Sequence, residues 1–532
     1  MVWVVTPSSS WAVSRLSSNL KIGTNMKKIF YTIALSAAVA VVASCNLDLV
    51  PNSAIAYNPE QIVESESDLN GFENGMFAYY RGSLYGVYSI ASEVMCDGFN
   101  AMVDFGNNYG SIHRTDASFS ATDYDAEDHW EGLYHAIMRY NVVINGLQTN
   151  VPADLAEKAA VVRGEGYFFR ADAYLRLVRL YGKAYGNGTP ASDLGVPLVL
   201  EYDQTARPAR NTVQEVYDQI KVDLDSAATL LANVKGAVRA QKPTIDAVNA
   251  LYARYYLDTK NFANAATYAQ RVIDSAAGYA LSSTAEEMTA EWYNDNGKEP
   301  VIQLYATYAE RPNRNYDAFT NTARDPEWGD YFRPYFLPSS NLMNLYEDGD
   351  LRLAQWFDKG AHYVFYNSDY HTGEFYVFTK YLGNPALRAN PTAMPDGYQA
   401  VKPILISEMY LIAAEANLGA GNAAAAKAAL NTLQTKRGAT ATDATASAIH
   451  NEWFKETVGE GTRMVCLKRW NEGFSSRPGQ AGAVAGGALA QGPAYEAKSL
   501  PAGDFHYLWP IPSHEFEVNS NLVQNPGYSA AE

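Results

Sequence analysis

The chain has 532 residues, with 41 lysines and arginines against 58 aspartates and glutamates, giving a formal charge of −17. This acidity argues against nucleic-acid binding, which needs a basic face to neutralise phosphates. Hydrophobic residues make up 47% and charged residues 19% of the chain, which excludes wholesale disorder. Three cysteines are too few for a disulfide framework. The 38 tyrosines combine a flat apolar ring with a polar tip, which suits wet recognition surfaces as well as helix packing.

A secretory signal is predicted at residues 26–44. Two lysines after Met26 precede an uncharged stretch over residues 29–44, which is too short and too alanine-rich for a membrane-spanning helix. Residues 1–25 are interpreted as a non-native upstream extension, because Met26 is the better start. The four residues ending at Cys45 resemble a bacterial lipobox, which implies cleavage before Cys45 and acylation of that residue. The alternative is an ordinary signal followed by a buried cysteine.

The body of the chain is predicted to be mainly helical. From residue 158 to 181, apolar or small residues recur in steps of three and four, and Gly182 ends this pattern. Two further units, 244–277 and 405–436, each predict a helical hairpin with turns at 260–261 and 421–422. Each unit carries two alanines twelve residues apart across its turn: Ala253 and Ala265, then Ala414 and Ala426.

Small residues at this spacing let antiparallel helices approach closely, as in tetratricopeptide hairpins; generic helical hairpins are the alternative. The two units lie 161 residues apart, so they are not a tandem array, and we expect a scaffold that carries large insertions. Residues 291–403 are rich in Tyr, Trp, Pro, Asn and Asp, and ligand binding is expected there. Within them, alternating residues 363–366 and 375–378 predict strands joined around 371–373. Residues 478–493 predict a flexible surface loop without chemistry.

Several separated motifs occur in a fixed order behind the lipobox. They occupy residues 163–182, 195–198, 402–416, 430–438, 460–470, 509–512 and 524–528. Together they resemble the SusD/RagB family of outer-membrane nutrient-binding lipoproteins over residues 45–532. Cys466 stands where the family usually has Asp, and Trp453 where it usually has Arg, which puts a local ion-pair network in question. Arg163, Arg170 and Arg463 are expected to anchor helix ends or to pair across the scaffold.

The resemblance implies one domain over residues 45–532: a tetratricopeptide-like helical hairpin scaffold with large loop-rich insertions and a few short β-hairpins. It implies variable ligand-binding segments at about 81–115 and 291–403. It also implies a location at the outer membrane, facing the cell exterior, and a partner. The partner is a SusC-like TonB-dependent transporter, over which the lipoprotein sits as a lid.

Catalytic and cofactor motifs are absent from the sequence. No H-E-x-x-H, G-x-S-x-G, C-x-x-C or phosphate-binding loop occurs, and the eight histidines are scattered singly. We therefore predict no cofactor, no metal site and no catalytic residue. An acid pair for glycoside hydrolysis is not excluded by counting, because 58 carboxylates are present. The resemblance, however, implies a non-catalytic binder.

Two segments, residues 97–109 and residues 292–335, combine flat aromatic rings with amides and carboxylates, the mixture that recognises sugars. Arg81 falls where the family resemblance places a ligand arginine. Ala101 and Val103 occupy places where the starch-binding member has tryptophans, which argues against starch. The candidate ligand contacts are Arg81, Phe99, Asn100, Asp104, Phe105, Asn107, Asn108, Tyr109, Trp292, Tyr293, Trp328 and Tyr331.

Four functions follow from these observations. The first is a non-enzymatic, surface-anchored lipoprotein that hands oligosaccharides to a TonB-dependent transporter. The second keeps the fold and the partner but binds peptides, as in the RagB branch. The third is a lipid-anchored glycosidase, and the fourth is a structural tetratricopeptide assembly factor. The aromatic-rich insertion favours the first.

Overall fold

The computed structural model describes residues 63–530 except 150, 204 and 496. The predicted extension 1–25, the signal 26–44 and Cys45 lie outside the described residues. The described part is mainly helical with a few short antiparallel strand pairs, which confirms the predicted fold class. No described helix is both long enough and apolar enough to cross a membrane.

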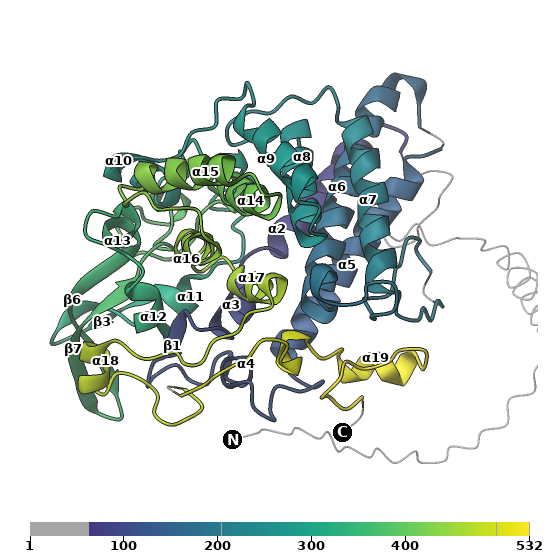
Figure 1. Cartoon of the computed structure of the whole chain (residues 1–532). Helices are drawn as coiled ribbons and strands as arrows, with labels where there is room; N and C mark the ends of the chain where they lie inside the picture. Colours follow the sequence, from purple (N-terminus) through teal and green to yellow (C-terminus); the bar gives the residue numbers. More distant parts are fainter. Residues whose placement is uncertain (1–62, 150, 204, 496, 531–532) are drawn as a thin grey trace, which may run out of the picture. The chain divides into compact units, whose positions relative to one another are not determined.

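Seven helices form the scaffold, and each packs against the next (Figure 1). The order of packing is α5, α6, α7, α8, α9, α14 and α15. Their bounds are α5 Tyr124–Gly146, α6 Ala156–Tyr181, α7 Val213–Leu230, α8 Ile245–Asp258, α9 Phe262–Ile273, α14 Ile406–Gly419 and α15 Ala423–Lys436. Gly182 caps the C-terminus of α6, where the sequence predicted it.

The two predicted helical hairpins form, and they are neighbours in space. Helices α8 and α9 are joined at residues 259–261, and α14 and α15 at 420–422. The four spaced alanines are all fully buried. Helix α9 packs against α14, so the hairpins stack although a long insertion separates them in sequence. Gly419 permits this contact, because a Cβ there would lie 2.6 Å from the Phe262 ring.

The three arginines of the scaffold motifs have the predicted anchoring and pairing roles. The Arg170 guanidinium donates to both carboxylate oxygens of Asp223, at 2.9 and 2.6 Å, joining α6 to α7. Arg163 donates to the carbonyl of Leu147, which caps α5. Arg463 donates to both oxygens of Asp97, at 2.8 and 3.0 Å.

The remaining helices flank the scaffold or lie in the insertions. Helix α2 begins with a capping box between Ser65 and Asp68, which satisfies its first amide groups. The bounds of these remaining helices are α2 Glu66–Gly82, α3 Val87–Val94, α4 Gly110–Arg114, α10 Ala285–Trp292, α11 Tyr316–Phe319, α12 Ser340–Met343, α13 Leu351–Trp356, α16 Ala446–Glu456, α17 Arg463–Trp470, α18 Ala481–Ala485 and α19 Ser513–Val518.

The described strands form four two-stranded antiparallel pairs. They are β1 Phe99–Ala101 with β5 Phe336–Pro338, β2 Pro300–Ile302 with β8 Ile404–Leu405, β3 Thr322–Asp325 with β4 Gly329–Phe332, and β6 Phe357–Tyr366 with β7 Asp369–Phe378. The β6–β7 hairpin was predicted with its turn around residues 371–373, and this was wrong. Asn367 and Ser368 form the turn, both with positive φ, and residues 371–373 lie inside β7. A two-residue turn of this kind matches the twist of the strands.

Residues 478–493 are not the flexible surface loop predicted from their composition. They contain α18, and Ala483, Ala488 and Leu489 are buried in a small apolar cluster with residues of β5, β6 and β7. Gly482 and Gly486 allow α18 to lie directly on β7. A Cβ at Gly482 would lie 1.9 Å from the carbonyl oxygen of Glu374. This segment therefore packs against the β6–β7 hairpin and supports it.

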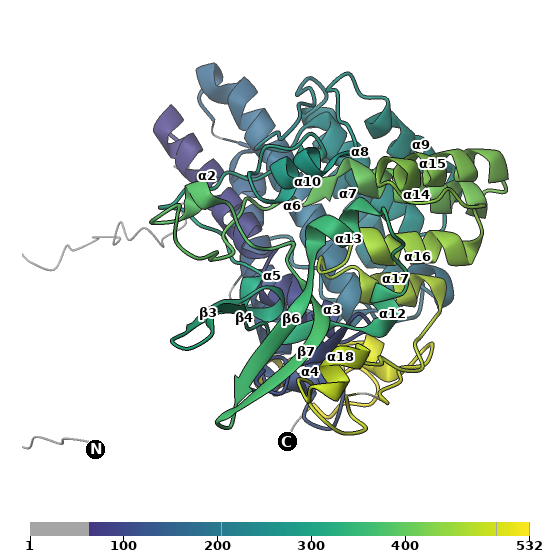
Figure 2. The same ribbon diagram turned by 90° about the vertical axis from the view of Figure 1, so that its left-hand side faces the viewer.

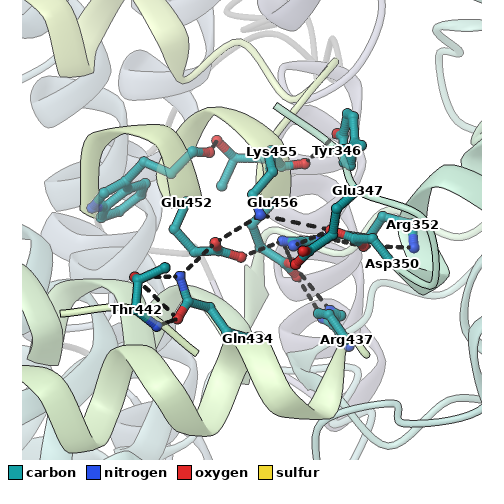
Figure 3. Close-up of polar contacts among 12 residues, drawn as sticks. Tyr346, Glu347, Asp350, Arg352, Gln434, Arg437, Thr442, Glu452, Lys455 and Glu456 are labelled. Atoms are coloured by element: carbon teal, nitrogen blue, oxygen red, sulfur yellow. Dashed lines mark hydrogen bonds and ion pairs between the residues drawn. The ribbon is translucent and has the colours of Figure 1, made fainter. Parts of the chain in front are cut away.

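A buried ion-pair network joins α13, α15 and α16 (Figure 3). The Arg352 guanidinium lies 2.6 Å from Glu452 and 2.9 Å from Glu456, and Arg437 donates to Glu456 and to both oxygens of Glu299. The network therefore includes Glu452, the residue next to Trp453. Near Cys466, the Arg469 guanidinium forms a separate ion pair with Glu415 at 2.8 Å. Ion pairs thus form around both unusual residues.

Candidate functional site

A pocket of about 830 Å³ lies between the β3–β4 hairpin, the β6–β7 hairpin and the segment that follows them; we call it the hairpin pocket. The two hairpins lie side by side on one face of the described part (Figure 2). The residues that line the hairpin pocket are Thr322, Arg324, Trp328, Asp330, Tyr331, Phe332, Asp358, Ala361, His362, Tyr363, Thr372, Leu382, Thr392, Ala393, Met394 and Pro395.

The turn of the β3–β4 hairpin places Trp328. The Asp325 carboxylate accepts from the backbone N–H groups of Glu327 and Trp328, at 2.8 and 2.9 Å. Gly329 follows with φ +85°, a conformation that favours glycine. The indole ring therefore sits at the hairpin end with 47% of its surface exposed.

Aromatic rings form a continuous wall along the hairpin pocket. The Trp328 ring stacks on Tyr370, with centroids 4.5 Å apart and planes 7° apart, and meets Tyr363 edge-on at 4.7 Å. Tyr331 stacks on Tyr363, with ring centroids 4.5 Å apart. Burial raises the pKa of Tyr363 to about 12, so its hydroxyl stays protonated at neutral pH. Such a wall offers flat apolar faces with polar edges.

The charged groups of the hairpin pocket are held by one another. Arg324 donates to both oxygens of Asp330 across the β3–β4 hairpin, at 2.5 and 2.9 Å. Nε2 of His362 lies 3.4 Å from the Asp358 carboxylate. An exposed, bidentate arginine–carboxylate pair presents planar hydrogen-bonding edges, which match the paired hydroxyls of a sugar.

The early segment contributes polar groups beside β4. The Asp104 carboxylate lies 2.6 Å from the guanidinium of Arg333, the residue that follows β4. Asn107 is exposed and accepts from Arg114 at 2.7 Å, while Asn108 donates to the carbonyl of Phe105. Tyr109 is partly buried and adopts a left-handed conformation before α4.

The other candidates of this segment are packed in the interior. Phe99 is fully buried against Phe319, and Asn100 is 2% exposed. Phe105 is 7% exposed and meets Phe336 edge-on. Phe99 and Asn100 belong to β1, which pairs with β5 and is buried on both faces. These three residues therefore support the fold and do not line the hairpin pocket.

Trp292 and Tyr293 lie at the end of α10, apart from the hairpin pocket. Trp292 is 7% exposed and packs edge-on against Trp356, with the ammonium group of Lys380 4.1 Å from its ring centroid. Tyr293 is partly buried, and the Arg388 guanidinium lies 5.7 Å from its ring centroid.

Arg81 lies beside a second group of exposed aromatic residues. Its guanidinium donates to the carbonyl of Tyr305 at 2.8 Å, and the Tyr305 side chain is 49% exposed. The neighbouring Arg311 guanidinium is sandwiched between Tyr308 and Tyr398, at 4.9 and 4.1 Å from their ring centroids. We call residues 305, 308, 311 and 398 with Arg81 the tyrosine–arginine ladder.

The two groups meet at one loop. Residues 393–395 line the hairpin pocket, and the next residue, Asp396, lies 3.8 Å from Arg311 of the ladder. The structure thus brings Trp328 and Tyr331 together in one pocket, with Asp104 beside β4 and Arg81 on the ladder. Phe99 and Trp292 stay in the core.

Comparisons with known proteins locate the chain in a family. Residues 46–257 match the SusD-like model described as "Starch-binding associating with outer membrane". Residues 253–528, more than half of the chain, match the SusD family model. The chain belongs to the SusD family.

Individual relatives of this SusD-family chain are distant. SusD-like protein P2 from Formosa agariphila is 24% identical over 94% of this chain and 100% of its own length. A SusD superfamily structure from Bacteroides thetaiotaomicron aligns with a TM-score of 0.70 at 24% identity, covering 86% of this chain and 99% of that one. A laminarin binding SusD-like protein aligns with a TM-score of 0.64 at 19% identity, covering 88% and 100%.

The SusD-family chain uses residues in its pocket that the sequence reasoning missed. The pocket is lined by His362 and Tyr363 of β6 and by Arg324 of β3, and Tyr370 of β7 stacks on Trp328. The alternating run at 363–366 identified the strand but not its register, and register decides which side chains face the pocket. The Arg311–Tyr398 contact joins residues 87 positions apart, and no local pattern in the sequence indicates it.

The described residues of this SusD-family chain contain no group of three side chains placed to hold a metal ion. Cys96 and Cys466 are both buried with free thiols. Burial raises the pKa of the Cys466 thiol to about 11, so it stays protonated at neutral pH.

Proposed function

We propose that this protein is a non-catalytic, lipid-anchored cell-surface protein that binds oligosaccharides and delivers them to a SusC-like TonB-dependent transporter. Family membership supports a carbohydrate-binding role at the outer membrane. The binding site of this chain is the hairpin pocket, with Trp328 and Tyr331 as stacking residues. The tyrosine–arginine ladder with Arg81 extends the site along the same surface.

One observation carries the choice of a glycan: an exposed tryptophan stacked in a wall of tyrosines at the edge of an open pocket. The C–H faces of a sugar ring pack on such rings, and planar polar groups beside them accept and donate to neighbouring hydroxyls. A peptide groove would instead offer an open strand edge or a row of backbone-binding amides. Each strand of the two-stranded β3–β4 and β6–β7 hairpins keeps one edge unpaired by any described strand, so the choice of a glycan over a peptide rests on the aromatic side chains that line the pocket.

The binding role is tested by electrophoresis of the soluble fragment 46–532 through gels that contain single polysaccharides. This fragment contains the whole compact unit Gln61–Glu532. We expect one glycan class to retard the fragment while the glycan stays intact in the gel. Retardation by none of them, together with saturable binding to peptides, would favour a RagB-like role. Release of shortened sugars would make the protein a glycosidase.

The anchor and the partner are tested in cells. Because acylation of Cys45 would be the attachment to the membrane, Cys45→Ala should remove the protein from the cell surface. Surface labelling and co-purification with the transporter barrel are the two readouts. Cys466→Ala is the matched control, since its thiol is buried and we expect normal display. Normal display of Cys45→Ala would refute the lipid anchor.

A further inference from the structure

A second cavity, which we call the guanidinium cavity, lies inside the helical scaffold and shares no lining residue with the hairpin pocket. Its volume is about 140 Å³, the space of roughly four or five water molecules. Helices α3, α5, α6, α8, α14, α16 and α17 contribute to its wall. The wall carries five cationic side chains: Arg176, Arg179, Arg254, Lys402 and Arg469.

Four of these guanidinium groups have N–H donors to spare. Arg176 and Arg179 use only Nε, donating to Asp172 at 2.7 Å and to Asp258 at 2.6 Å, so both of their Nη groups lack a hydrogen-bond partner among the described residues. Nη1 of Arg254 and Nη1 of Arg469 also make no hydrogen bond there, and their ion pairs, with Asp172 at 3.7 Å and with Asp258 at 4.0 Å, are long. None of these Nη groups is fully buried, so each keeps some solvent-accessible surface.

The carboxylates of the wall are occupied and fewer in number. Asp172 is held by Arg176, Glu408 receives two hydrogen bonds from Arg254, and Glu460 is paired with Lys380 at 2.6 Å. The acids that pair with the other cations are not among the lining residues: Asp258 pairs with Arg179, Glu415 with Arg469 and Asp295 with Lys402. Each of the five cations of the wall thus has at least one carboxylate partner, and what the cavity offers an anion is the unused Nη donors of its arginines.

The guanidinium cavity adjoins a pocket at the protein surface. A shallow surface pocket of about 320 Å³ lies between α2, α3 and α5. It shares Ser83 and Tyr88 with the wall of the guanidinium cavity. An ion that reached the guanidinium cavity from this pocket would pass Ser83 and Tyr88, whereas a cavity of about 140 Å³ is too small for an oligosaccharide.

We propose that the guanidinium cavity binds a small tetrahedral oxyanion, namely inorganic phosphate or sulfate. Several guanidinium edges around one small space offer forked pairs of N–H donors, the geometry that oxyanion oxygens accept best. The bound anion would satisfy the spare Nη groups of Arg176, Arg179, Arg254 and Arg469. It would thereby join α6, α8 and α17 through one shared partner.

The test measures thermal unfolding and calorimetric binding of fragment 46–532 with sodium phosphate, sodium sulfate or sodium chloride at matched ionic strength. We expect phosphate or sulfate to bind saturably and to raise the melting temperature by about 2 °C or more over chloride. Glucose 6-sulfate distinguishes a free anion from a sulfated sugar, and we expect it not to bind in this cavity. An equal melting temperature in all three salts would overturn the proposal, as would binding of the sulfated sugar alone.

Two variants assign the effect to the cavity. Arg176→Gln and Arg179→Gln should each weaken anion binding by about tenfold or more, because each removes two spare Nη groups. Arg176→Gln also serves if Arg179→Gln fails to fold, since the Arg176 side chain is the more exposed. Arg271→Gln on α9, outside the cavity, is the matched control and should leave binding unchanged. Unchanged affinity in Arg176→Gln would contradict the site.

Discussion

At the scale of single residues, the exposed indole of Trp328 distinguishes the hairpin pocket from the packed aromatic core. Both regions contain tryptophan rings in contact with other rings, but Trp292 is 7% exposed and Trp328 is 47% exposed. An aromatic ring buried against its neighbours stabilises the fold, whereas a half-exposed stacked ring keeps one face for a ligand. Exposure, which the sequence does not display, therefore separates the two candidate roles.

Replacing Trp328 should reduce ligand affinity without unfolding the protein. We expect Trp328→Ala to weaken binding of the preferred glycan by about tenfold or more, because the largest stacking face of the pocket is lost. Titration calorimetry measures the affinity, and circular dichroism checks the fold. Tyr268→Ala on α9 is the matched control, since this ring is also stacked and partly exposed but lies on the scaffold. Equal loss in both variants would argue against the hairpin pocket.

At the scale of elements, the helices follow from sequence patterns and the insertions do not. Helix α6 and both helical hairpins have the predicted bounds to within a few residues, because apolar periodicity and turn residues act locally. The β6–β7 turn was misplaced, since two consecutive positive φ values at Asn367 and Ser368 are not obvious in an Asn-Ser pair. Segment 478–493 was misread because its small residues pack against strands over a hundred positions earlier, which composition does not reveal.

For the candidate ligand contacts, the sequence predicted the residue type and the position in the chain. It did not predict whether each side chain faces the pocket or the core. Trp328 and Tyr331 lie in the pocket, while Phe99 and Trp292, chosen for the same reasons, lie in the core. Pairing of β1 with β5 and packing of α10 decide the difference. Both are contacts between distant parts of the chain.

Two glycine substitutions test how α18 supports the hairpin. Gly482→Ala should destabilise the protein by roughly 2 kcal/mol or more, because its Cβ would collide with the backbone of β7. Gly75→Ala in α2 has no atom within 4 Å of the new Cβ and should stabilise by about 0.5–1 kcal/mol. Urea denaturation measures both. Similar stabilities for the two variants would mean that α18 does not rest on β7.

At the scale of the whole molecule, the network in Figure 3 links the insertion to the scaffold. Arg352 belongs to α13 in the insertion, Arg437 caps α15 of the scaffold, and Glu456 at the end of α16 accepts from both. Burial alone would raise the pKa of Glu456, but its ion pairs with Arg437 and Arg352 outweigh burial and hold the pKa at about 2. Its charge therefore helps to hold α13 of the insertion against α15 and α16.

The pH dependence of stability follows from this carboxylate. Its pKa is about 2 when folded and near 4.5 when unfolded, so its contribution is complete above pH 4.5 and is lost as the pH falls towards 2. We expect that loss to be about 3 kcal/mol. Glu456→Gln should lack this portion of the acid dependence and should be about 3–5 kcal/mol less stable at pH 7, because two arginines lose a buried partner.

Urea denaturation at pH 7, 4 and 3 measures this difference. Glu517→Gln is the matched control, since Glu517 is exposed and its charge should affect stability little at any of these pH values. If Glu456→Gln and the unaltered protein lost stability in parallel between pH 4.5 and 3, the network would not link the insertion to the scaffold electrostatically.

Calorimetric titration of fragment 46–532 tests the central claim most directly. The panel contains plant, host and microbial oligosaccharides together with mixed peptides. We predict saturable binding to one glycan class, lost or strongly weakened in Trp328→Ala and unchanged in Tyr268→Ala. Binding to peptides alone, or glycan binding that survives Trp328→Ala undiminished, would contradict the assignment of the hairpin pocket as a glycan site.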